Sequence, residues 1–407
     1  MEDFLSRGRA AVKANTGQAG PGFHVVMGNE ACDLDSMVCA LAYAYFLSKT
    51  GSGETIALPL LNIRQSDLLL RSDNIFLLRQ TDLSPELLLF RDQLDLLALQ
   101  RAGRLQLTLV DHNVLPSSDS DLEGAVVEVI DHHLLEREPS PSCPVTVETV
   151  GSCATLVTEQ IIQKAPQILD QQLAQLLYGK VTPKDSQYLA ALETRFPALP
   201  PRGALFQALQ NAKFDVSGLN TEQMLLKDMK AVSGSLNLAV SVLYITLEEF
   251  LQRAELEAEL SGFCQKFGFD LLLLMTISFT ESKEPIRELA VFSHSSTCRD
   301  QVSQYLEQTH SPALNLCPIS SPHPRISAYQ QGNTLASRKK LLPIVKDFLR
   351  EWDGDVCLGD GEEEESRVPP TPMNSLVEGC PLDDGLPHIS AQDLEEKFSK
   401  MADRGGN

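Results

Sequence analysis

The sequence predicts an α/β protein, in which an N-terminal parallel sheet with helices on both faces precedes a smaller mixed α/β domain. Two features of the 407 residues lead to this prediction. Apolar runs of strand length alternate with helical patterns through the first half, as they do in parallel sheets. A proline-richer stretch then leads into a second, shorter series of strands and helices. The hydrophobic content of 43% is enough to give each domain a buried core.

The first half of the chain contains five strand-like runs. They occupy residues 23–28, 55–63, 105–111, 125–131 and 145–150. A helix is expected over residues 36–49, with Ser36 as its N-cap, because a hydroxyl there can accept a hydrogen bond from the first helical N–H groups. Further helical patterns lie near 85–102 and at 153–164.

The second half follows a connection at residues 181–215, which contains the predicted domain boundary. We expect one domain over residues 1–200 and another over 215–352. Strands are predicted in the second domain at 237–246, 270–280 and 288–294, and helices at 247–266, 298–309 and 337–352. Residues 353–407 combine an acidic run with prolines and few large apolar side chains, so we predict a disordered tail there.

The charge of the chain argues against nucleic acid as its partner. The formal net charge is −21 and the pI is about 4.8, whereas surfaces that bind nucleic acids are usually basic. Residues 351–407 contain 15 Asp and Glu against 4 Lys and Arg, so much of the negative charge lies in the tail. This tail is a candidate for recruiting protein partners, and the alternative is an ordinary solvated extension.

The cysteines and the apolar runs indicate the compartment. The nine cysteines are odd in number and form no Cys-x-x-Cys pair, which suits reduced thiols better than a disulfide framework. The N-terminal residues lack an apolar stretch typical of a signal peptide, and no run approaches the roughly 18 apolar residues of a membrane span. We expect a cytoplasmic protein without membrane association, with the nucleus as the alternative.

Acidic and histidine side chains follow three of the predicted strands. They are Asp33 and Asp35 after the first, Asp111 at the end of the third, and Asp131, His132 and His133 at the end of the fourth. The carboxyl ends of parallel strands share one edge of the sheet, where open α/β folds bind ligands. Carboxylates with imidazoles suit Mn²⁺ or Mg²⁺ better than a structural zinc site. We expect a two-metal site that binds a phosphoanhydride and activates water to attack phosphorus.

Each of these motifs has a simpler interpretation when it is taken alone. An Asp-x-Asp-Ser sequence is usually a loop turn or a helix cap. A His-His pair belongs to the surface or the core more often than to a metal site. Their joint placement after separate strands favours the metal site.

The order of the motifs resembles that of the DHH phosphoesterase superfamily. Asp-x-Asp-Ser at 33–36, Asp-His-Asn at 111–113 and Asp-His-His at 131–133 are followed by Gly-Ser-Cys-Ala-Thr at 151–155 and Ser-Arg-Lys-Lys at 337–340. The likeness is to the branch that contains family II inorganic pyrophosphatases and short-chain exopolyphosphatases, and it covers nearly the whole chain. It implies a metal-dependent hydrolase that cleaves phosphoanhydride bonds of short-chain polyphosphate.

The resemblance also implies roles for individual residues. Metal contacts fall to Asp33, Asp35, Asp111 and His133, and the catalytic set is Asp111, His132 and His133, supported by Asp131. Arg338 and Lys339 would bind substrate phosphates, which suits an Arg fork and a Lys charge at a helix start. Lys213 is a weaker candidate for the same contact. An ordinary basic helix start, and for Lys213 a solvated surface lysine, are the alternatives.

Two positions depart from the family pattern. The pyrophosphatase pattern has a histidine four residues before the first Asp of Asp-x-Asp, where this chain has Asn29, a poorer manganese ligand. The pattern also continues from a Leu-Leu-x-Gly segment, here residues 176–179, into a strand that ends in a fourth metal-bridging Asp. This strand and its Asp are missing from the sequence. An alternative function is therefore kept: a catalytically impaired isoform, or a scaffold that binds partners through its tail.

Overall fold

The computed structural model describes residues 1–14, 20–51, 53–138, 143–178, 183–280 and 284–352. The chain divides into two compact units, with the division between Lys213 and Phe214. The tail predicted at 353–407 lies outside the described residues. Among those that are described, we find no helix with the length and apolar character needed to span a bilayer.

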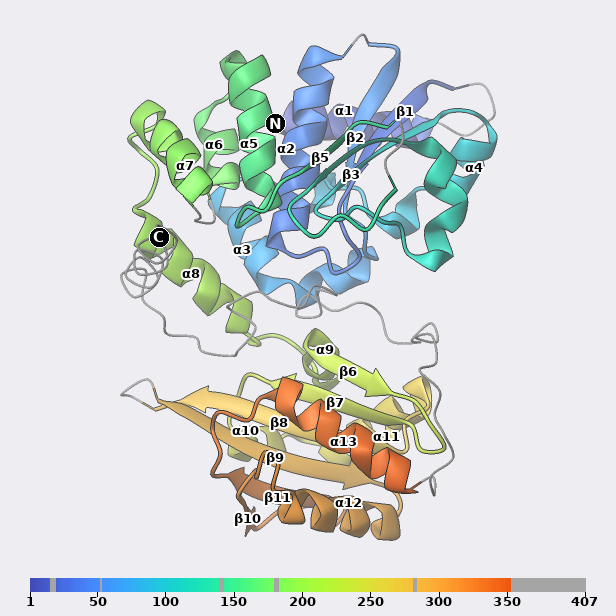
Figure 1. The fold of residues 1–407 in the computed structure, drawn as a ribbon, viewed down its shortest axis with the longest axis vertical. Helices are drawn as coiled ribbons and strands as arrows, with labels where there is room; N and C mark the ends of the chain where they lie inside the picture. The colour runs from blue at the N-terminus through green and yellow to red at the C-terminus, as the bar shows by residue number, and fades with distance from the viewer. Residues whose placement is uncertain (15–19, 52, 139–142, 179–182, 281–283, 353–407) are drawn as a thin grey trace, which may run out of the picture. The chain divides into compact units, whose positions relative to one another are not determined.

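The first unit is built on a five-stranded parallel sheet with the order β2-β1-β3-β4-β5 (Figure 1). All five predicted runs form strands, and the parallel sheet is confirmed. The last strand is the shortest of the five, with three residues. The strands are β1 (Gly22–Met27), β2 (Thr55–Leu60), β3 (Leu105–Val110), β4 (Val126–Asp131) and β5 (Val145–Val147).

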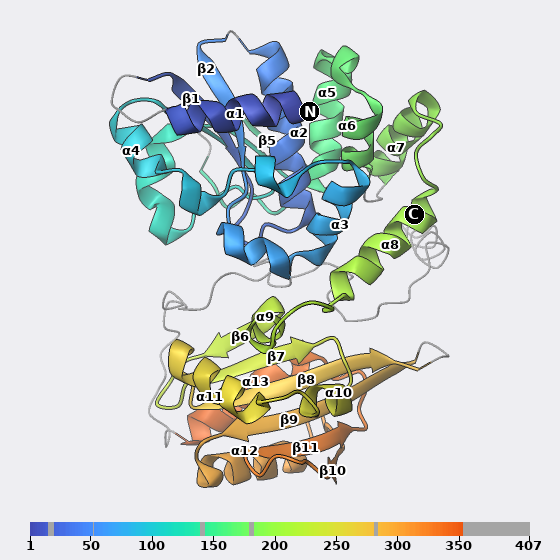
Figure 2. The same cartoon turned by 180° about the vertical axis from the view of Figure 1, so that it is seen from behind.

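Helices cover both faces of this sheet, as predicted (Figures 1 and 2). Along each strand, alternate residues face opposite cores. Val26 and Val110 pack in the core that contains α2 and α5, whereas Val25 and Leu107 pack in the core that contains α4. The helices of this unit are α1 (Glu2–Ala14), α2 (Leu34–Thr50), α3 (Ser72–Gln80), α4 (Leu96–Arg101), α5 (Cys153–Lys164), α6 (Gln171–Leu177), α7 (Pro183–Arg195) and α8 (Arg202–Phe214).

The structure corrects three details of the sequence prediction in this unit. Helix α2 starts earlier than expected and its N-cap is Asp33, not Ser36, because the Asp33 carboxylate accepts the backbone N–H of Ser36 at 3.0 Å. The helical stretch predicted near 85–102 is interrupted before α4: short 3-10 helices at Pro85–Leu87 and Arg91–Gln93 flank an extended segment, in which Phe90 forms a parallel bridge with Leu61. The connection at 181–215 contains two helices, α7 and α8.

The second unit is a six-stranded mixed sheet with helices, which confirms the predicted mixed α/β domain. Its order is β10-β11-β9-β8-β7-β6, and only the β7–β8 pair among the described strands is parallel. Short strands that the sequence analysis missed lie at both edges. The strands are β6 (Met229–Val232), β7 (Leu238–Leu243), β8 (Leu271–Phe279), β9 (Pro285–Ser293), β10 (Leu316–Ile319) and β11 (Ile326–Gln331).

The helices of the second unit include one division that the sequence did not indicate. The predicted helix at 247–266 is two helices, because Glu255 adopts a left-handed conformation with φ of 61° between them. Helix α13 packs on one face of the sheet, through Leu341, Val345 and Phe348. The helices are α9 (Thr221–Lys227), α10 (Leu247–Leu251), α11 (Leu256–Phe267), α12 (Ser296–Gln308) and α13 (Arg338–Trp352).

Candidate metal site

The strand order of the first unit fixes the position of its ligand site. In the order β2-β1-β3-β4-β5, the chain moves to one side of β1 to form β2 and then to the other side to form β3. The loops that follow β1 and β3 therefore diverge and leave a crevice at the carboxyl ends of these strands, which is where open α/β folds bind ligands. Asp33 and Asp111 lie in these two loops, and Asp131 ends the adjacent β4.

Three buried side chains hold the loop that follows β1. Asn62 Nδ2 donates to the carbonyl of Gly28 at 3.2 Å, Arg71 Nε donates to that of Ala31 at 2.8 Å, and Asn74 Nδ2 donates to that of Cys32 at 2.9 Å. Buried backbone carbonyls are costly unless they are hydrogen-bonded, so these contacts stabilise one loop conformation.

Helix α2 packs closely against this loop, with Ser36 next to Gly28. A Cβ atom on Gly28 would lie 2.7 Å from the Cβ of Ser36, so no larger residue fits there without a shift. Ser36 occupies the first turn of α2, and its hydroxyl donates to Oδ2 of Asp111 at 2.7 Å. The serine predicted to be a cap therefore contacts the site directly.

The Asp111 side chain is buried, with 2% of its surface exposed. Asp111 has a left-handed backbone with φ of 63°, which is uncommon outside glycine. Oδ2 accepts hydrogen bonds from Ser36 and from Asn29 Nδ2, the latter at 3.1 Å. Within the described residues Oδ1 accepts no hydrogen bond of good geometry, and it lies 3.2 Å from His132 Nε2.

The two histidines present their Nε2 atoms for coordination. His132 Nδ1 lies 2.9 Å from the carbonyl of Val150, and His133 Nδ1 lies 2.7 Å from Oδ1 of Asp131. Because each of these acceptors requires a proton on Nδ1, Nε2 of the neutral ring carries the lone pair. This pattern is typical of metal-binding histidines, whose other ring nitrogen donates to a carbonyl or carboxylate.

Asp131 fixes the histidine pair from inside the protein. It is fully buried, and it accepts hydrogen bonds from three donors. These are Nδ1 of His133, the backbone N–H of His132 at 2.8 Å and Nδ2 of Asn113 at 2.6 Å. These contacts hold the backbone of His132 and the ring of His133 in place.

The electrostatics of the cluster favour a positive charge between Asp111 and His132. Burial, together with the negative charges of Asp35 and Asp33, raises the pKa of Asp111 to about 7. Burial alone would lower the pKa of His132, but its contacts with Asp111 and the charge of Asp35 raise it to about 9. A proton on His132 satisfies the unpaired oxygen of Asp111, and a divalent cation held by the same atoms would do so as well.

The donor set fits a divalent cation. Asp111, His132 and His133 each offer one ligand atom, and these atoms all lie within 4.8 Å of one another. Carboxylate and imidazole donors suit Mn²⁺ or Mg²⁺, and the unpaired oxygen of buried Asp111 gives the cation an anionic partner. Of the predicted site residues, the structure thus brings Asp111, His132 and His133 into one cluster.

Asp35 and Asp33 border this cluster and also make structural contacts. Asp35 Oδ2 lies 3.7 Å from Nε2 of His132. The Asp35 carboxylate also accepts hydrogen bonds from the Ser152 hydroxyl at 2.8 Å and from the backbone N–H groups of Cys153 and Ala154. It therefore joins α2 to the positive N-terminal end of α5.

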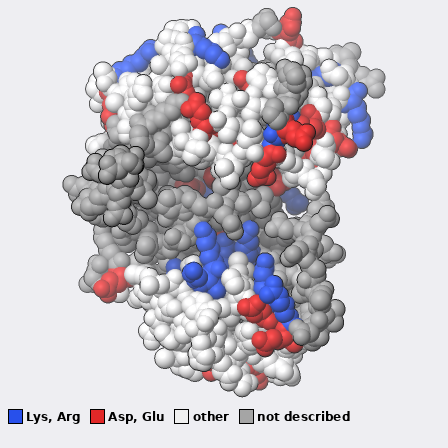
Figure 3. Space-filling model, in the orientation of Figure 1, with Lys and Arg blue, Asp and Glu red and all other residues white. Residues whose placement is uncertain are grey.

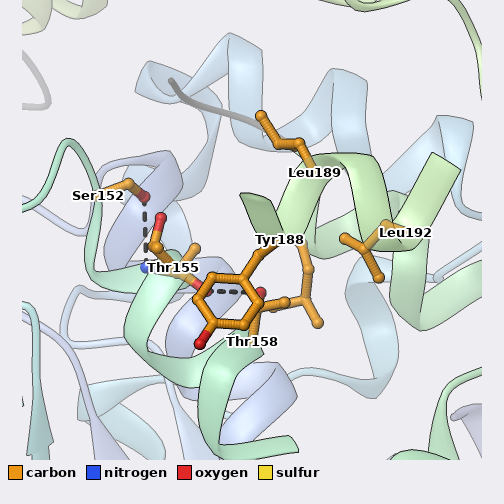
Figure 4. Close-up of a pocket in the computed structure, with 8 residues that line it drawn as sticks. Ser152, Thr155, Thr158, Tyr188, Leu189 and Leu192 are labelled. Atoms are coloured by element: carbon orange, nitrogen blue, oxygen red, sulfur yellow. Dashed lines mark hydrogen bonds between the residues drawn. The ribbon is translucent and has the colours of Figure 1, made fainter. Parts of the chain in front are cut away.

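A small cavity lies beside Ser152, between α5, α6 and α7 (Figure 4). Its volume is about 10 Å³, and its lining includes Ser152, Thr155 and Tyr188. One water molecule occupies roughly that space. The cavity is thus too small for a polyphosphate, and the candidate substrate crevice remains the edge at Asp111.

The predicted phosphate-binding residues lie on α8 and α13, far along the sequence from the residues of the metal cluster. Lys213 is half-buried near the end of α8. Arg338 and Lys339 begin α13 in the second unit, with Arg338 half-buried and Lys339 exposed. On the face drawn in Figure 3, Lys and Arg side chains gather over the region where α13 begins.

Two residues that shape the metal cluster were not predicted from the sequence. Asn113 and Ser36 were noted only as a neighbour in a motif and as a cap. Both lie within two residues of a metal-ligand candidate, Asn113 after Asp111 and Ser36 after Asp35. The departure at Asn29 also has a structural outcome, because its amide donates to Asp111 instead of offering an imidazole.

Two family models together match most of the chain. The model described as DHH family, N-terminal domain, matches residues 24–179, and the DHHA2 domain model matches residues 207–348.

Similar proteins are known in animals, a fungus and an archaeon. The chain is 46% identical over 446 positions to Exopolyphosphatase PRUNE1 of Homo sapiens, which covers 99% of this chain and 97% of that protein. It is 26% identical to a putative exopolyphosphatase of Schizosaccharomyces pombe, over 86% of this chain and 98% of that protein. The crystal structure of a Methanococcus jannaschii putative family II inorganic pyrophosphatase is 18% identical, with a TM-score of 0.44, over 82% of this chain and 100% of that chain.

The alignment with the human protein is longer than this chain. It extends over 446 positions against 407 residues, so at least 39 positions, the difference of the two, have no residue here. The strand that the sequence analysis found missing falls after residue 178, and residues 179–182 lie outside the described part of the chain. Helix α7 begins at Pro183.

Proposed function

This chain belongs to the DHH family, in the group of prune-like exopolyphosphatases, and from that premise we propose that it hydrolyses the phosphoanhydride bonds of short-chain polyphosphate at the carboxyl edge of its first sheet. The observation that carries the proposal is the cluster of Asp111, His132 and His133, whose ligand atoms lie within 4.8 Å of one another. Within the described residues, Oδ1 of Asp111 accepts no hydrogen bond of good geometry. Divalent-metal dependence follows from the family and from this donor set.

The residues of the cluster have distinct roles in the proposed reaction. Asp111 and His133 would hold the first cation together with His132, which was predicted as a catalytic residue and not as a metal contact. Asp33 and Asp35, the other predicted metal contacts, are the candidates for holding a second one. A bound divalent cation supplies Lewis acidity, which lowers the pKa of water to near neutrality. We assign Mn²⁺ ahead of Mg²⁺, because two imidazoles are softer donors than the all-oxygen set that Mg²⁺ prefers.

The histidines are held in the tautomer that the proposed reaction needs. Val150 and Asp131 keep the Nδ1 protons in place, so the Nε2 atoms face the crevice as ligands. Asn29 and Ser36 orient Asp111 from its other oxygen, at 3.1 and 2.7 Å. Residues held by several contacts move little during a reaction, and such preorganisation lowers the barrier.

The substrate contacts are assigned to basic residues at two helices. Arg338 and Lys339 at the start of α13 would bind phosphate oxygens, Arg through paired N–H groups and Lys through its charge. Lys213 would add a further positive charge. We propose domain bounds of 1–200 for the unit with the metal cluster and 215–352 for the unit with Arg338 and Lys339.

Phosphate release from tripolyphosphate tests this function directly. The purified chain is assayed with Mn²⁺, with Mg²⁺ and with a chelator, beside the variants Asp111→Ala and Asp121→Ala. Asp121 is an exposed carboxylate of the same unit and serves as the matched control. Asp111→Ala should lower the rate by about 100-fold, roughly 2.7 kcal/mol of barrier, whereas Asp121→Ala should not. Equal rates for wild type and Asp111→Ala would reject the proposal.

The tail and the compartment complete the proposal. We infer that residues 353–407 recruit protein partners, because their acidic and proline-containing sequence offers charge without a core. In a pull-down, residues 1–352 alone should fail to bind the partners that the full chain binds, and identical partner sets would contradict this role.

The free cysteines of the described residues, six of them buried, suit the cytoplasm or the nucleus, which we propose as the compartment.

A further inference from the structure

Arg338 is held by an ion pair within the second unit. Its Nη1 lies 2.5 Å from Oδ1 of Asp228, and the two side chains are only 13% and 8% exposed. Asp228 is the last residue before β6 and ends α9. A charge pair removed from water in this way is sensitive to the loss of either partner, unlike an exposed pair.

The carboxylate that holds Arg338 is itself fixed at two points. Its second oxygen, Oδ2, accepts the hydroxyl of Tyr244 at 2.7 Å, and its backbone carbonyl accepts the N–H of Val242 at 2.8 Å. The Tyr244 ring packs against Phe214 with a centroid separation of 5.0 Å. Burial, together with the charge of Asp228, raises the pKa of Tyr244 well above its ordinary range, so its hydroxyl remains a donor.

The backbone that precedes Arg338 is also held from inside the second unit. Arg287 Nε donates to the carbonyl of Thr334 at 2.8 Å. Gln331 Nε2 donates to the carbonyls of Asn333 and Ala336 at 2.7 and 2.8 Å. Both donors are nearly fully buried, at 4% and 2% exposure. The start of α13 therefore has its main chain and its guanidinium fixed by separate sets of contacts.

An ordered guanidinium has a consequence for binding an anion. A free arginine side chain has many rotamers, and an anion that binds it must restrict them. When the rotamer is fixed beforehand, that restriction is already in place and the anion binds more tightly. The Asp228 carboxylate also reduces the positive charge that the anion meets. It therefore favours anion binding by ordering the guanidinium and disfavours it by partly neutralising the charge.

We propose that Asp228 is a positioning residue, which orders the guanidinium of Arg338 for contact with a substrate phosphate. The inference rests on the proposed function, in which Arg338 binds substrate. Ordering outweighs charge reduction here because the acidic partner is shared with Tyr244 and is held in one place by the sheet. Asp228 has no role in the sequence analysis, since Lys-Asp-Met-Lys at 227–230 matches no motif used there.

Kinetics of Asp228 variants on tripolyphosphate with Mn²⁺ test this proposal. Asp228→Ala should raise KM by about 10-fold and change kcat by less than about twofold. Asp228→Asn should recover KM to within about threefold of wild type, because its oxygen can occupy the position of Oδ1 next to the Arg338 guanidinium while the Tyr244 hydroxyl accepts a hydrogen bond from its amide. Asp347→Asn is the matched control, since Asp347 pairs with Arg350 on the same helix with both side chains more than half exposed.

The outcomes separate this inference from the proposed function. If the wild-type chain releases no phosphate, the proposed function fails, and calorimetric binding of tripolyphosphate to the Mn²⁺-loaded chain then measures the positioning effect, again expected at about 10-fold for Asp228→Ala. A KM or Kd for Asp228→Ala equal to or below that of wild type would overturn the inference. So would a loss in kcat and Tm at unchanged KM.

Tyr244→Phe gives a second test if Asp228→Ala does not fold. It keeps the ring and the carboxylate but removes the hydroxyl that holds Oδ2. KM should rise by about threefold with kcat unchanged. An unchanged KM would contradict the positioning role.

Discussion

Replacing Asp131 by Asn should weaken metal binding, although Asn has the same shape as Asp. Both carboxylate oxygens of Asp131 accept hydrogen bonds, one from His133 and His132 and the other from Asn113. An amide has a single oxygen, so its NH₂ group must face one of these donors. Asn113 cannot turn over to accept it without breaking other hydrogen bonds, because its Nδ2 also donates to Leu134 and its Oδ1 accepts the N–H of Glu136.

The magnitude follows from the hydrogen bonds that the substitution removes. In the variant, the new NH₂ group faces an N–H donor where the carboxylate accepted a hydrogen bond. A hydrogen bond to a charged group is worth about 1.5–3 kcal/mol, and this one is lost. We therefore expect the Kd for Mn²⁺ to rise by about 10- to 100-fold, which is the range usual for residues that support metal-binding histidines. The direct assay is calorimetric titration with Mn²⁺, with Asp121→Asn as an exposed control. An Asp131→Asn variant that binds Mn²⁺ as tightly as this control would refute the reasoning.

Three further predictions concern stability. Saturating Mn²⁺ should raise Tm by about 5–10 °C over the chelated chain, since 100-fold excess over Kd contributes about 2.7 kcal/mol, and an unchanged Tm would contradict binding to the folded state. Asn74→Ala should cost about 1–3 kcal/mol in urea unfolding, because the buried carbonyl of Cys32 loses its donor. Burial raises the pKa of Glu128 above the 4.5 of the unfolded chain. Ionisation of Glu128 therefore destabilises the fold at pH 7, whereas below pH 4.5 the side chain is protonated in both states and has no such effect. Glu128→Gln should therefore raise Tm at pH 7 but leave it unchanged at pH 4, and a pH-independent difference would contradict this cause.

The parallel sheet could be predicted because its strands are buried on both faces. Residues on both faces of β1 and β3 are fully buried, as at Val25, Val26, Leu107 and Val110. The sequence of each strand is therefore a continuous apolar run. The short strands at the edges of the second sheet lack this signal: Cys317 and Ile319 of β10 are exposed. The extended residues 88–90 were wrongly predicted as part of a helix because a short extended buried run and a buried helix have similar composition.

From the sequence, only those site residues could be predicted that directly follow a predicted strand. Asp111 and the two histidines follow apolar strands, and the rule that such ends share one edge brings them together. The partners that orient them cannot be predicted in this way, because they depend on distances across the fold. Ser36 contacts Asp111 across 75 positions of sequence, and Ser152 contacts Asp35 across 117. Asp228 and Arg338 are likewise far apart in the chain.

The central claim is that Asp111, His132 and His133 hold a divalent cation together. The most direct measurement is the Mn²⁺ content of the purified chain after equilibrium dialysis, compared with that of the His132→Ala and His133→Ala variants and of His24→Ala, a control at the other end of β1. We predict that the wild type and His24→Ala retain Mn²⁺ and that each of the other variants binds it at least 10-fold more weakly. Equal Mn²⁺ content in all four proteins would contradict the account.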